Sequence, residues 1–358
     1  MKKVGITLIV SFLIGAVIFS FFLYRVGLNA VTLIFENLNI FYFMIFFFFC
    51  SLSFVFSTAR HYIILRAYGK KVPFLLLMKQ MIAGYSVSYV TPSIRLGGEP
   101  IRAYMLKKEA GVDLKTGTAS IIMDKFVEIG GLTLFGLLGV VLFLLTPGIA
   151  FSFKLTIIFV TVFVFLFLLI FYYRVIKGHG SFSTLFSLAQ LDKFEKLNSI
   201  LAAILDIEKK LKKFFTHHKK ALFSSLFVYW IYLFISILQM KFLLLSLGVN
   251  GSVNTIVLSL TALGVAELIP VPAALGFLEA GQAGLFSLLK MGGSTGFAVS
   301  LLLRVSALFF VALGFAFILS LGGTELFKFV GKIMKEGKIE IKKSRKLKRK
   351  VKKNSRQH

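Results

Sequence analysis

Long runs of apolar residues dominate the chain, and short polar segments separate them. The runs long enough to form membrane spans lie at about 4–24, 40–59, 114–146, 151–173, 222–247 and 295–321. About 20 residues of α-helix, rising about 1.5 Å each, cross a hydrocarbon core of about 30 Å. The pattern therefore predicts an all-α, polytopic membrane protein with about six to eight transmembrane helices.

Two further apolar segments, at about 73–102 and 253–289, are interrupted by helix-breaking residues. The breakers are Pro92, Gly97 and Gly98 in the first segment and Pro270, Pro272 and Gly276 in the second. Broken backbone at membrane depth is tolerated only where protein or a water-filled cavity satisfies its free N–H and C=O groups. We therefore expect two re-entrant or broken-helix hairpins that line a cavity. A short span followed by an ordinary loop stays open for the first segment, and two full crossings stay open for the second.

The two interrupted segments share a spacing. In each, a proline is followed by a glutamate and then by a charged residue in a long apolar run: Pro92, Glu99 and Asp124, then Pro272, Glu279 and Arg304. Both intervals are identical in the two segments. A pair of interrupted segments in two related halves is the sequence pattern that points to a transporter's binding site. The spacing predicts an inverted repeat.

The predicted domain organisation follows from this repeat. A transmembrane domain covers residues 1–325, with halves at about 40–173 and 220–321 and an amphipathic cytoplasmic linker at 174–219. A basic cytoplasmic tail covers 326–358.

The distribution of charge predicts the orientation in the membrane. The hydrophobic residues make up 57% of the chain, above the usual 45–50% or so of soluble domains. Of the 42 Lys and Arg residues, 10 lie in 60–115, 10 in 174–220 and 14 in 328–358. Basic segments beside membrane spans stay in the cytoplasm. We therefore expect a multi-pass protein of the cell membrane with both termini in the cytoplasm.

The net charge of +27 raises the question of a nucleic-acid partner. The charge follows the loops and the tail, and a basic segment beside a span attracts anionic lipid headgroups by about 1 kcal/mol per basic residue. We therefore expect membrane lipids as partners, with anionic headgroups at the basic tail, and no nucleic acid. A homodimer stays open.

Seven charged residues in the predicted spans and hairpins are candidates for a substrate path: Glu99, Arg102, Asp124, Lys125, Glu128, Glu279 and Arg304. A charge at the bilayer centre costs about 2.5–3.5 kcal/mol on insertion scales, so such residues pair with one another or line a path. We expect Asp124 or Glu128, which share a helix face, to pair with Arg304 across the two halves. Glu99 and Arg102 are expected on the cytoplasmic side of the same path. Ion pairs that only hold helices together stay open.

The sequence offers little for catalysis or metal binding. Cys50 is the only cysteine and lies in an apolar run, so we predict no disulfide within the chain and no Cys-based metal site. His61 follows Arg60 at the end of an apolar run and is expected at the membrane interface. We find no persuasive pairing of a nucleophile with a base, and therefore expect no cofactor, no metal and no enzyme. A lipid-modifying activity within the membrane stays open.

At these residues the chain resembles the lysylphosphatidylglycerol synthase transmembrane-region family, also called the flippase-like domain or UPF0104 membrane proteins. The similarity covers about residues 5–325. It rests on Thr91-Pro92, Gly98-Glu99, Arg102, Asp124-Lys125, Glu128, the segment from Pro270 to Glu279, and Arg304. The family usually has an arginine where this chain has Lys125.

The resemblance implies a lipid flippase or transporter that moves a phospholipid or a polyprenyl-phosphate-linked lipid between leaflets. In bacterial multiple peptide resistance factors the same domain precedes a soluble aminoacyl-transferase domain. Because this chain ends shortly after its last predicted span, we expect no such domain here. The alternatives are a non-transporting membrane adaptor and an accessory subunit of lipid or glycolipid biosynthesis.

Overall fold

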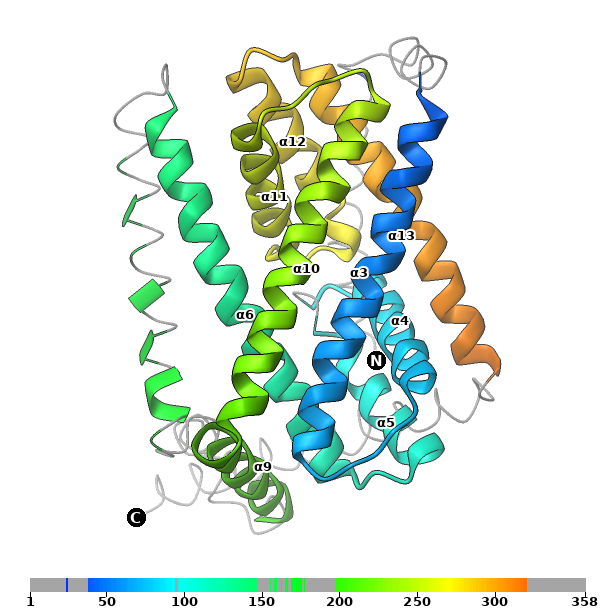
Figure 1. Cartoon of the computed structure of the whole chain (residues 1–358), viewed down its shortest axis with the longest axis vertical. Helices are drawn as coiled ribbons and strands as arrows, with labels where there is room; N and C mark the ends of the chain where they lie inside the picture. The colour runs from blue at the N-terminus through cyan, green and yellow to red at the C-terminus, as the bar shows by residue number, and fades with distance from the viewer. Residues whose placement is uncertain are drawn as a thin grey trace, which may run out of the picture.

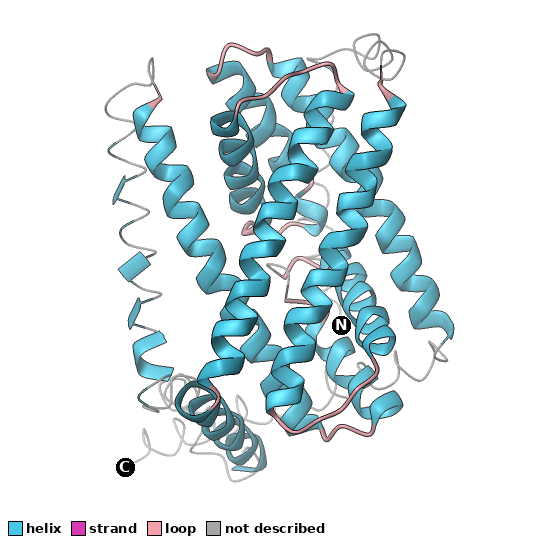
Figure 2. Ribbon diagram, in the orientation of Figure 1, coloured by secondary structure: helices cyan, strands magenta, loops and turns pink. Residues whose placement is uncertain are grey.

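The computed structural model describes residues 38–93, 96–146 and 198–320, together with Tyr24 and scattered positions between 155 and 177. All regular structure in this part of the chain is helical (Figure 2). The all-α prediction is therefore confirmed. The predicted spans at about 4–24 and 151–173 lie mostly outside the described residues, and the basic tail lies wholly outside them.

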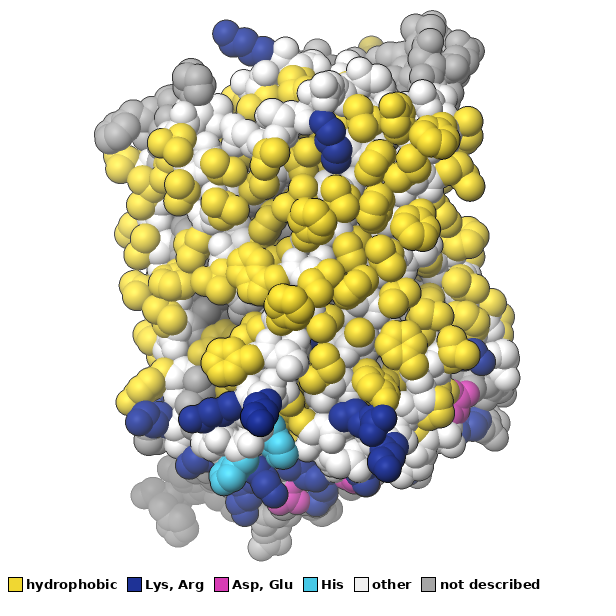
Figure 3. Space-filling view, viewed as in Figure 1, with side chains coloured by type: hydrophobic (Ala, Val, Ile, Leu, Met, Phe, Trp, Pro, Cys, Tyr) yellow, Lys and Arg dark blue, Asp and Glu magenta, His cyan; other side chains and the backbone are white. Residues whose placement is uncertain are grey.

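Four helices in the described part are long and apolar enough to cross a membrane. They are α3 (Ile40–Ala67), α6 (Leu114–Leu145), α10 (Lys219–Ser246) and α13 (Gly293–Ser320). Figure 1 shows all four running along the long axis of the molecule. On the face drawn in Figure 3, apolar side chains cover the middle, and Lys and Arg gather along the lower edge. This is the surface of a multi-pass membrane protein.

Two pairs of shorter helices form hairpins between the long ones. The first consists of α4 (Phe74–Val90) and α5 (Glu99–Ala110), and the second of α11 (Val253–Glu267), a short turn η2 (Pro272–Ala274) and α12 (Phe277–Leu288). In Figure 1 the first hairpin starts from and returns to the lower end of the molecule, and the second does the same at the upper end. Their tips meet at mid-height, where α4 contacts η2.

The lengths of these helices explain why they turn back. They have 12 to 17 residues. At about 1.5 Å per residue they reach about 18–26 Å, less than a hydrocarbon core of about 30 Å. Both predicted hairpins are therefore confirmed. The same lengths favour a hairpin over two full crossings in the second segment.

The break in the first hairpin depends on a close approach of its two arms. Thr91 Oγ1 donates to the carbonyl oxygen of Val87 at 2.8 Å and closes the last turn of α4. The N–H of Gly98 donates to Ser88 Oγ at 2.9 Å. A Cβ at Gly98 would overlap the carbonyl group of Gly84 on α4. Only glycine therefore lets the returning chain lie this close to α4.

The second hairpin turns through left-handed backbone. Pro272 opens the turn, and Ala273 follows with a φ of 56°. Gly276 has a φ of 80°, a conformation that favours glycine. Its N–H donates to Glu279 Oε2 at 2.8 Å, so α12 is capped by a glutamate of its own first turn.

The helix bounds support the inverted repeat. The interval from the start of α3 to the start of α10 recurs unchanged from α4 to α11 and from α6 to α13. Helices α3 and α10 pack along one another and run in opposite directions (Figure 1). We call α3 to α6 the first half and α10 to α13 the second half. The two halves have the same order of elements and opposite orientation, as in inverted-repeat transporters.

Helix α9 (Asn198–His217) lies across the lower end of the molecule, within the segment predicted to be amphipathic. Its apolar face buries Leu211 and Phe214. On its polar side Asp206 accepts a hydrogen bond from Lys115 Nζ of α6 at 2.6 Å. This hydrogen bond and the lysine charge lower the pKa of the Asp206 carboxyl. Beside it, Asp113 caps α6 and accepts from the N–H of Thr116 at 2.8 Å.

Candidate functional site

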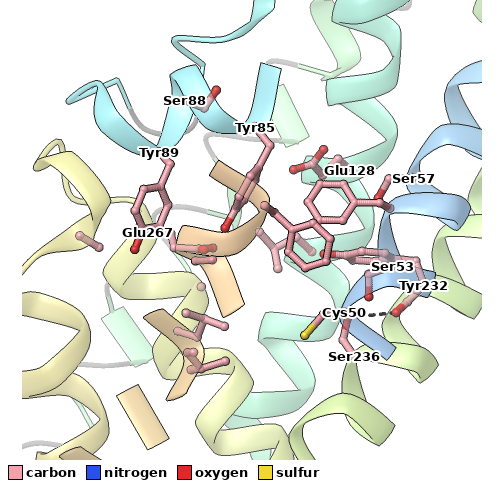
Figure 4. A pocket seen from close by; sticks show the side chains of 18 of the residues that line it. Cys50, Ser53, Ser57, Tyr85, Ser88, Tyr89, Glu128, Tyr232, Ser236 and Glu267 are labelled. Carbon is pink, nitrogen blue, oxygen red and sulfur yellow. Dashed lines mark hydrogen bonds between the residues drawn. The ribbon is translucent and has the colours of Figure 1, made fainter. Parts of the chain in front are cut away.

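A cavity of about 300 Å³ lies between the two halves, where the hairpin tips meet. Figure 4 shows side chains from several helices around it, among them Ser53 of α3, Tyr89 of α4 and Glu128 of α6 from the first half. The second half contributes Tyr232 of α10 and Glu267 of α11. Neither half could enclose this space alone, so the cavity depends on how the halves pack.

Six charged side chains of the first half form a closed ring in which acids and bases alternate. In order around the ring they are Arg60, Asp124, Arg102, Glu99, Lys125 and Glu128, each within 3.3 Å of the next. They come from α3, α5 and α6, so the ring ties one arm of the first hairpin to both long helices of its half. Three cations and three carboxylates give the ring a formal charge of zero. We call these six residues the charged ring.

Asp124 lies on the buried side of the charged ring and has no exposed surface. Its Oδ1 accepts from Arg60 Nε at 2.6 Å, and its Oδ2 accepts from Arg102 Nη2 at 3.0 Å. Arg60 also donates from Nη2 to Glu128 at 3.0 Å, and its guanidinium carbon lies 5.3 Å from the centre of the Tyr229 ring. A carboxylate held this far inside a membrane protein requires such partners, because an unpaired buried charge is strongly destabilising.

The other side of the charged ring faces the cavity. Glu99, Lys125 and Glu128 are between 17% and 23% exposed, whereas Asp124 is fully buried. Lys125 Nζ lies 3.3 Å from Glu99 and 3.3 Å from Glu128. Ion pairs that retain contact with water are weaker than buried ones. These are therefore the contacts of the ring that an incoming anion would exchange at the lowest cost.

A buried histidine, His61, contacts the charged ring through Arg102. Gln80 Nε2 and Arg102 Nη2 lie 2.8 Å and 3.1 Å from His61 Nδ1, and Ser120 Oγ lies 3.2 Å from His61 Nε2. Because two donors face Nδ1, we assign a neutral imidazole that carries its proton on Nε2.

The structure corrects the expected positions of two residues at the end of α3. His61 was expected at the membrane interface, but it has no exposed surface, and Arg60 is also buried. The apolar run ends at Ala59, yet the helix continues to Ala67. Arg60 and His61 therefore face the protein interior, and the helix reaches the end of the molecule almost two turns later.

The predicted pairing of Arg304 across the halves is wrong. Arg304 Nε and Nη2 both donate to the carboxylate of Glu279, the second at 2.9 Å, within the second half. Its Nη1 donates to the carbonyl oxygen of Ala273 at 3.1 Å and to the hydroxyl of Tyr89 at 3.3 Å. Both carboxylate oxygens of Asp124 accept hydrogen bonds from arginines of its own half. Helix α12 packs along α13, so the glutamate that caps α12 is the carboxylate nearest to Arg304.

The structure thus brings the seven candidate residues together in two clusters. Glu99, Arg102, Asp124, Lys125 and Glu128 lie in the charged ring, and Glu279 and Arg304 form the second cluster. Glu99 and Arg102 lie in the same ring as Asp124. Arg304 lines the cavity, as do all members of the ring except Asp124. Among the described residues, no group of three His, Cys, Asp or Glu side chains could hold a metal ion.

Several cavity residues were not singled out from the sequence. Arg60 was assigned to a span end, and the uncharged residues Ser53, Ser57, Ser236 and Gln239 were not considered. A signal was present, since Ser53, Ser57 and Arg60 recur at intervals of four and three residues along an apolar run and so share one helix face. The sequence alone does not show whether such a face meets lipid, another helix or a cavity.

Comparison with known proteins agrees with this architecture. A UPF0104 membrane protein of Methanothermobacter thermautotrophicus is 34% identical to the chain over 67 residues, which cover 17% of this chain and 20% of that protein. The chain thus matches about a fifth of this relative's length. The lysylphosphatidylglycerol synthase TM region family matches residues 8–314, which include both hairpins and both charged clusters. The chain therefore belongs to the lysylphosphatidylglycerol synthase TM region family.

Proposed function

We propose that this protein is a lipid flippase or transporter that moves a phospholipid or a polyprenyl-phosphate-linked lipid between leaflets. The observation that carries the proposal is the cavity at the hairpin tips, which charged side chains of both halves line. A lipid crossing a bilayer must take its polar headgroup through the hydrocarbon core, where a charge is costly. The polar and charged side chains in the cavity wall would supply the hydrogen bonds that water otherwise provides.

The charged ring and Arg304 supply cations for an anionic headgroup. Lys125 is the ring cation with the most exposed side chain, at 17%, and Arg304 is 11% exposed. A phosphate that enters would replace Glu99 or Glu128 as the partner of Lys125. The displaced carboxylate would lose one contact while Glu128 keeps Arg60 and Glu99 keeps Arg102. The headgroup can therefore bind without leaving a buried carboxylate unpaired.

The orientation belongs to the same proposal. We infer that the lower end in Figure 3, where Lys and Arg gather, faces the cytoplasm of the cell and its anionic lipids. The basic tail would bind the same headgroups, and both termini would lie on this side. The protein would act without a cofactor and would not modify the lipid it moves.

Reconstitution tests the proposal. Purified protein is placed in liposomes with lipids labelled on an acyl chain, and a membrane-impermeant reductant measures how fast the label changes leaflet. We expect movement above that of protein-free liposomes, and a loss of at least about tenfold in Lys125→Gln, since one charge-assisted contact contributes about 1.5–3 kcal/mol. The matched control is Lys79→Gln, because Lys79 is exposed on α4 and lies outside the cavity.

Two outcomes would count against lipid transport. Movement no faster than in protein-free liposomes, across phospholipids and polyprenyl phosphates, would favour a non-transporting adaptor or an accessory subunit. Equal rates in the wild type and in Lys125→Gln would show that headgroups do not pass the charged ring.

A further inference from the structure

The faces of α3 and α10 that line the cavity are counterparts in the repeat. Ser53, Ser57 and Arg60 of α3 match Tyr232, Ser236 and Gln239 of α10, and each pair is separated by the interval that separates the starts of the two helices. All six line the cavity. Figure 4 shows Ser53, Ser57, Tyr232 and Ser236 on one side of it, opposite Tyr89 and Glu267.

The repeat therefore pairs a charged position with an uncharged one. Arg60 is part of the charged ring, whereas its counterpart Gln239 accepts a hydrogen bond from Ser53 Oγ at 3.3 Å. Ser53, Ser57, Ser236 and Gln239 form an uncharged polar strip that runs across the contact of α3 and α10. We call these four residues the neutral strip.

The neutral strip retains hydrogen-bonding capacity toward the cavity. In the described part of the chain, the hydroxyl of Ser57 and the amide nitrogen of Gln239 have no hydrogen-bond partner, and both side chains are partly exposed. Ser236 donates to the carbonyl oxygen of Tyr232 at 3.0 Å, which leaves its oxygen able to accept. Unpaired donors in a membrane interior are costly unless water or a ligand satisfies them.

The chemistry of this strip selects a class of ligand. A phosphate only accepts hydrogen bonds and an ammonium only donates them, whereas a hydroxyl does both. The neutral strip offers donors at Ser57 and Gln239 and an acceptor at Ser236, without a formal charge. A phosphate is better served by the cations of the charged ring and Arg304.

We propose that the neutral strip binds the hydroxyl groups of the headgroup while the ring cations hold its phosphate. The substrate would then be an anionic phosphodiester lipid whose headgroup carries hydroxyls, as glycerol or a sugar does. This assignment rests on the proposed function and makes it more specific.

The test compares two lipids that carry the same charge. Phosphatidylglycerol and phosphatidylethanol, labelled on an acyl chain, are both phosphodiesters with one negative charge, and only the first has headgroup hydroxyls. We expect the wild type in liposomes to move phosphatidylglycerol faster. The double variant Ser57→Ala with Gln239→Leu should lower the ratio of the two rates about tenfold, because two hydrogen bonds of about 0.5–1.5 kcal/mol each are lost. Its rate with phosphatidylethanol should change little.

Controls come from the same two helices. Ser51→Ala on α3 and Ser224→Ala on α10 remove exposed hydroxyls that do not line the cavity, and should leave the ratio unchanged. If both lipids move equally fast, or if the double variant slows both to the same extent, the hydroxyl assignment is overturned and lipid transport stands. If no lipid moves, the proposed function fails and this inference fails with it. Uptake of soluble glycerol phosphate without lipid movement would also overturn it.

Discussion

Arg304 and Glu279 form a two-point ion pair inside the second half, and Glu279 has no exposed surface. The carboxylate is also bound to the N–H of Gly276, so one glutamate caps α12 and holds α13. Arg304 is not part of the charged ring, whose three cations and three carboxylates already give a formal charge of zero. Each half therefore balances its own buried charges, and within the described part of the chain Arg304 hydrogen-bonds to the first half only through the hydroxyl of Tyr89. A change in the relative position of the halves would therefore leave intact the Arg304–Glu279 pair and the pairs of the charged ring.

Mutational coupling will distinguish the two possible partners of Arg304. Arg304→Gln leaves Glu279 buried without its cation and should lower the free energy of unfolding by about 3–5 kcal/mol. The double variant Glu279→Gln with Arg304→Gln should recover much of this loss. Unfolding in detergent, followed by the fluorescence of the single tryptophan Trp230, gives the values. The matched cycle of Asp124→Asn with Arg304→Gln should show a coupling near zero; a large coupling there would contradict the observed pairing.

Arg60 should be far more sensitive to substitution than a neighbouring arginine on the same helix. Arg60→Gln removes one partner from Asp124 and one from Glu128, and we expect a loss of about 3 kcal/mol in the free energy of unfolding. Arg66 is exposed and contacts Tyr62, so Arg66→Gln should change stability by no more than about 0.5 kcal/mol. Equal thermal stability of the two variants in detergent would argue against the charged ring.

Glycine at position 98 should be required for the first hairpin. In Gly98→Ala the new methyl group would overlap the carbonyl group of Gly84, so the tip must move, at a cost of about 1–3 kcal/mol. Gly136→Ala on α6 is the control, because its methyl group would have no neighbour within 4 Å, and helix propensity would favour it by up to about 1 kcal/mol. The midpoints of thermal unfolding should move in opposite directions. A Gly98→Ala variant as stable as the wild type would mean that α5 need not lie so close to α4.

Labelling of introduced cysteines should show that the hairpins re-enter the membrane. In a Cys50→Ser background, Lys71→Cys and Glu109→Cys flank the first hairpin, and Asn250→Cys and Ser294→Cys flank the second. An impermeant thiol reagent should label the first pair only after the cells are opened and the second pair from outside, because each hairpin returns to its own side. Opposite accessibility of Lys71→Cys and Glu109→Cys would mean that α4 and α5 cross the membrane completely.

The apolar runs, the breakers and the shared spacing of proline, glutamate and buried charge determine much of the fold from the sequence. Inside a membrane the backbone must satisfy its own hydrogen bonds, so an apolar run of about 20 residues has little alternative to a helix. Pro92 and Gly98, like Pro272 and Gly276, interrupt this bonding wherever they stand. These effects are local, which is why the hairpins and the repeat could be predicted.

The partners of the buried charges were decided only by the tertiary structure. Asp124, Arg60 and Arg304 all lie deep in helices, and nothing local to each residue shows which opposite charge its helix will face. That choice depends on the rotation and crossing of packed helices, and a turn of about 100° per residue moves a side chain from one neighbour to another. Because α5 packs against α6, Arg102 contacts Asp124. Because α12 packs along α13, Glu279 contacts Arg304.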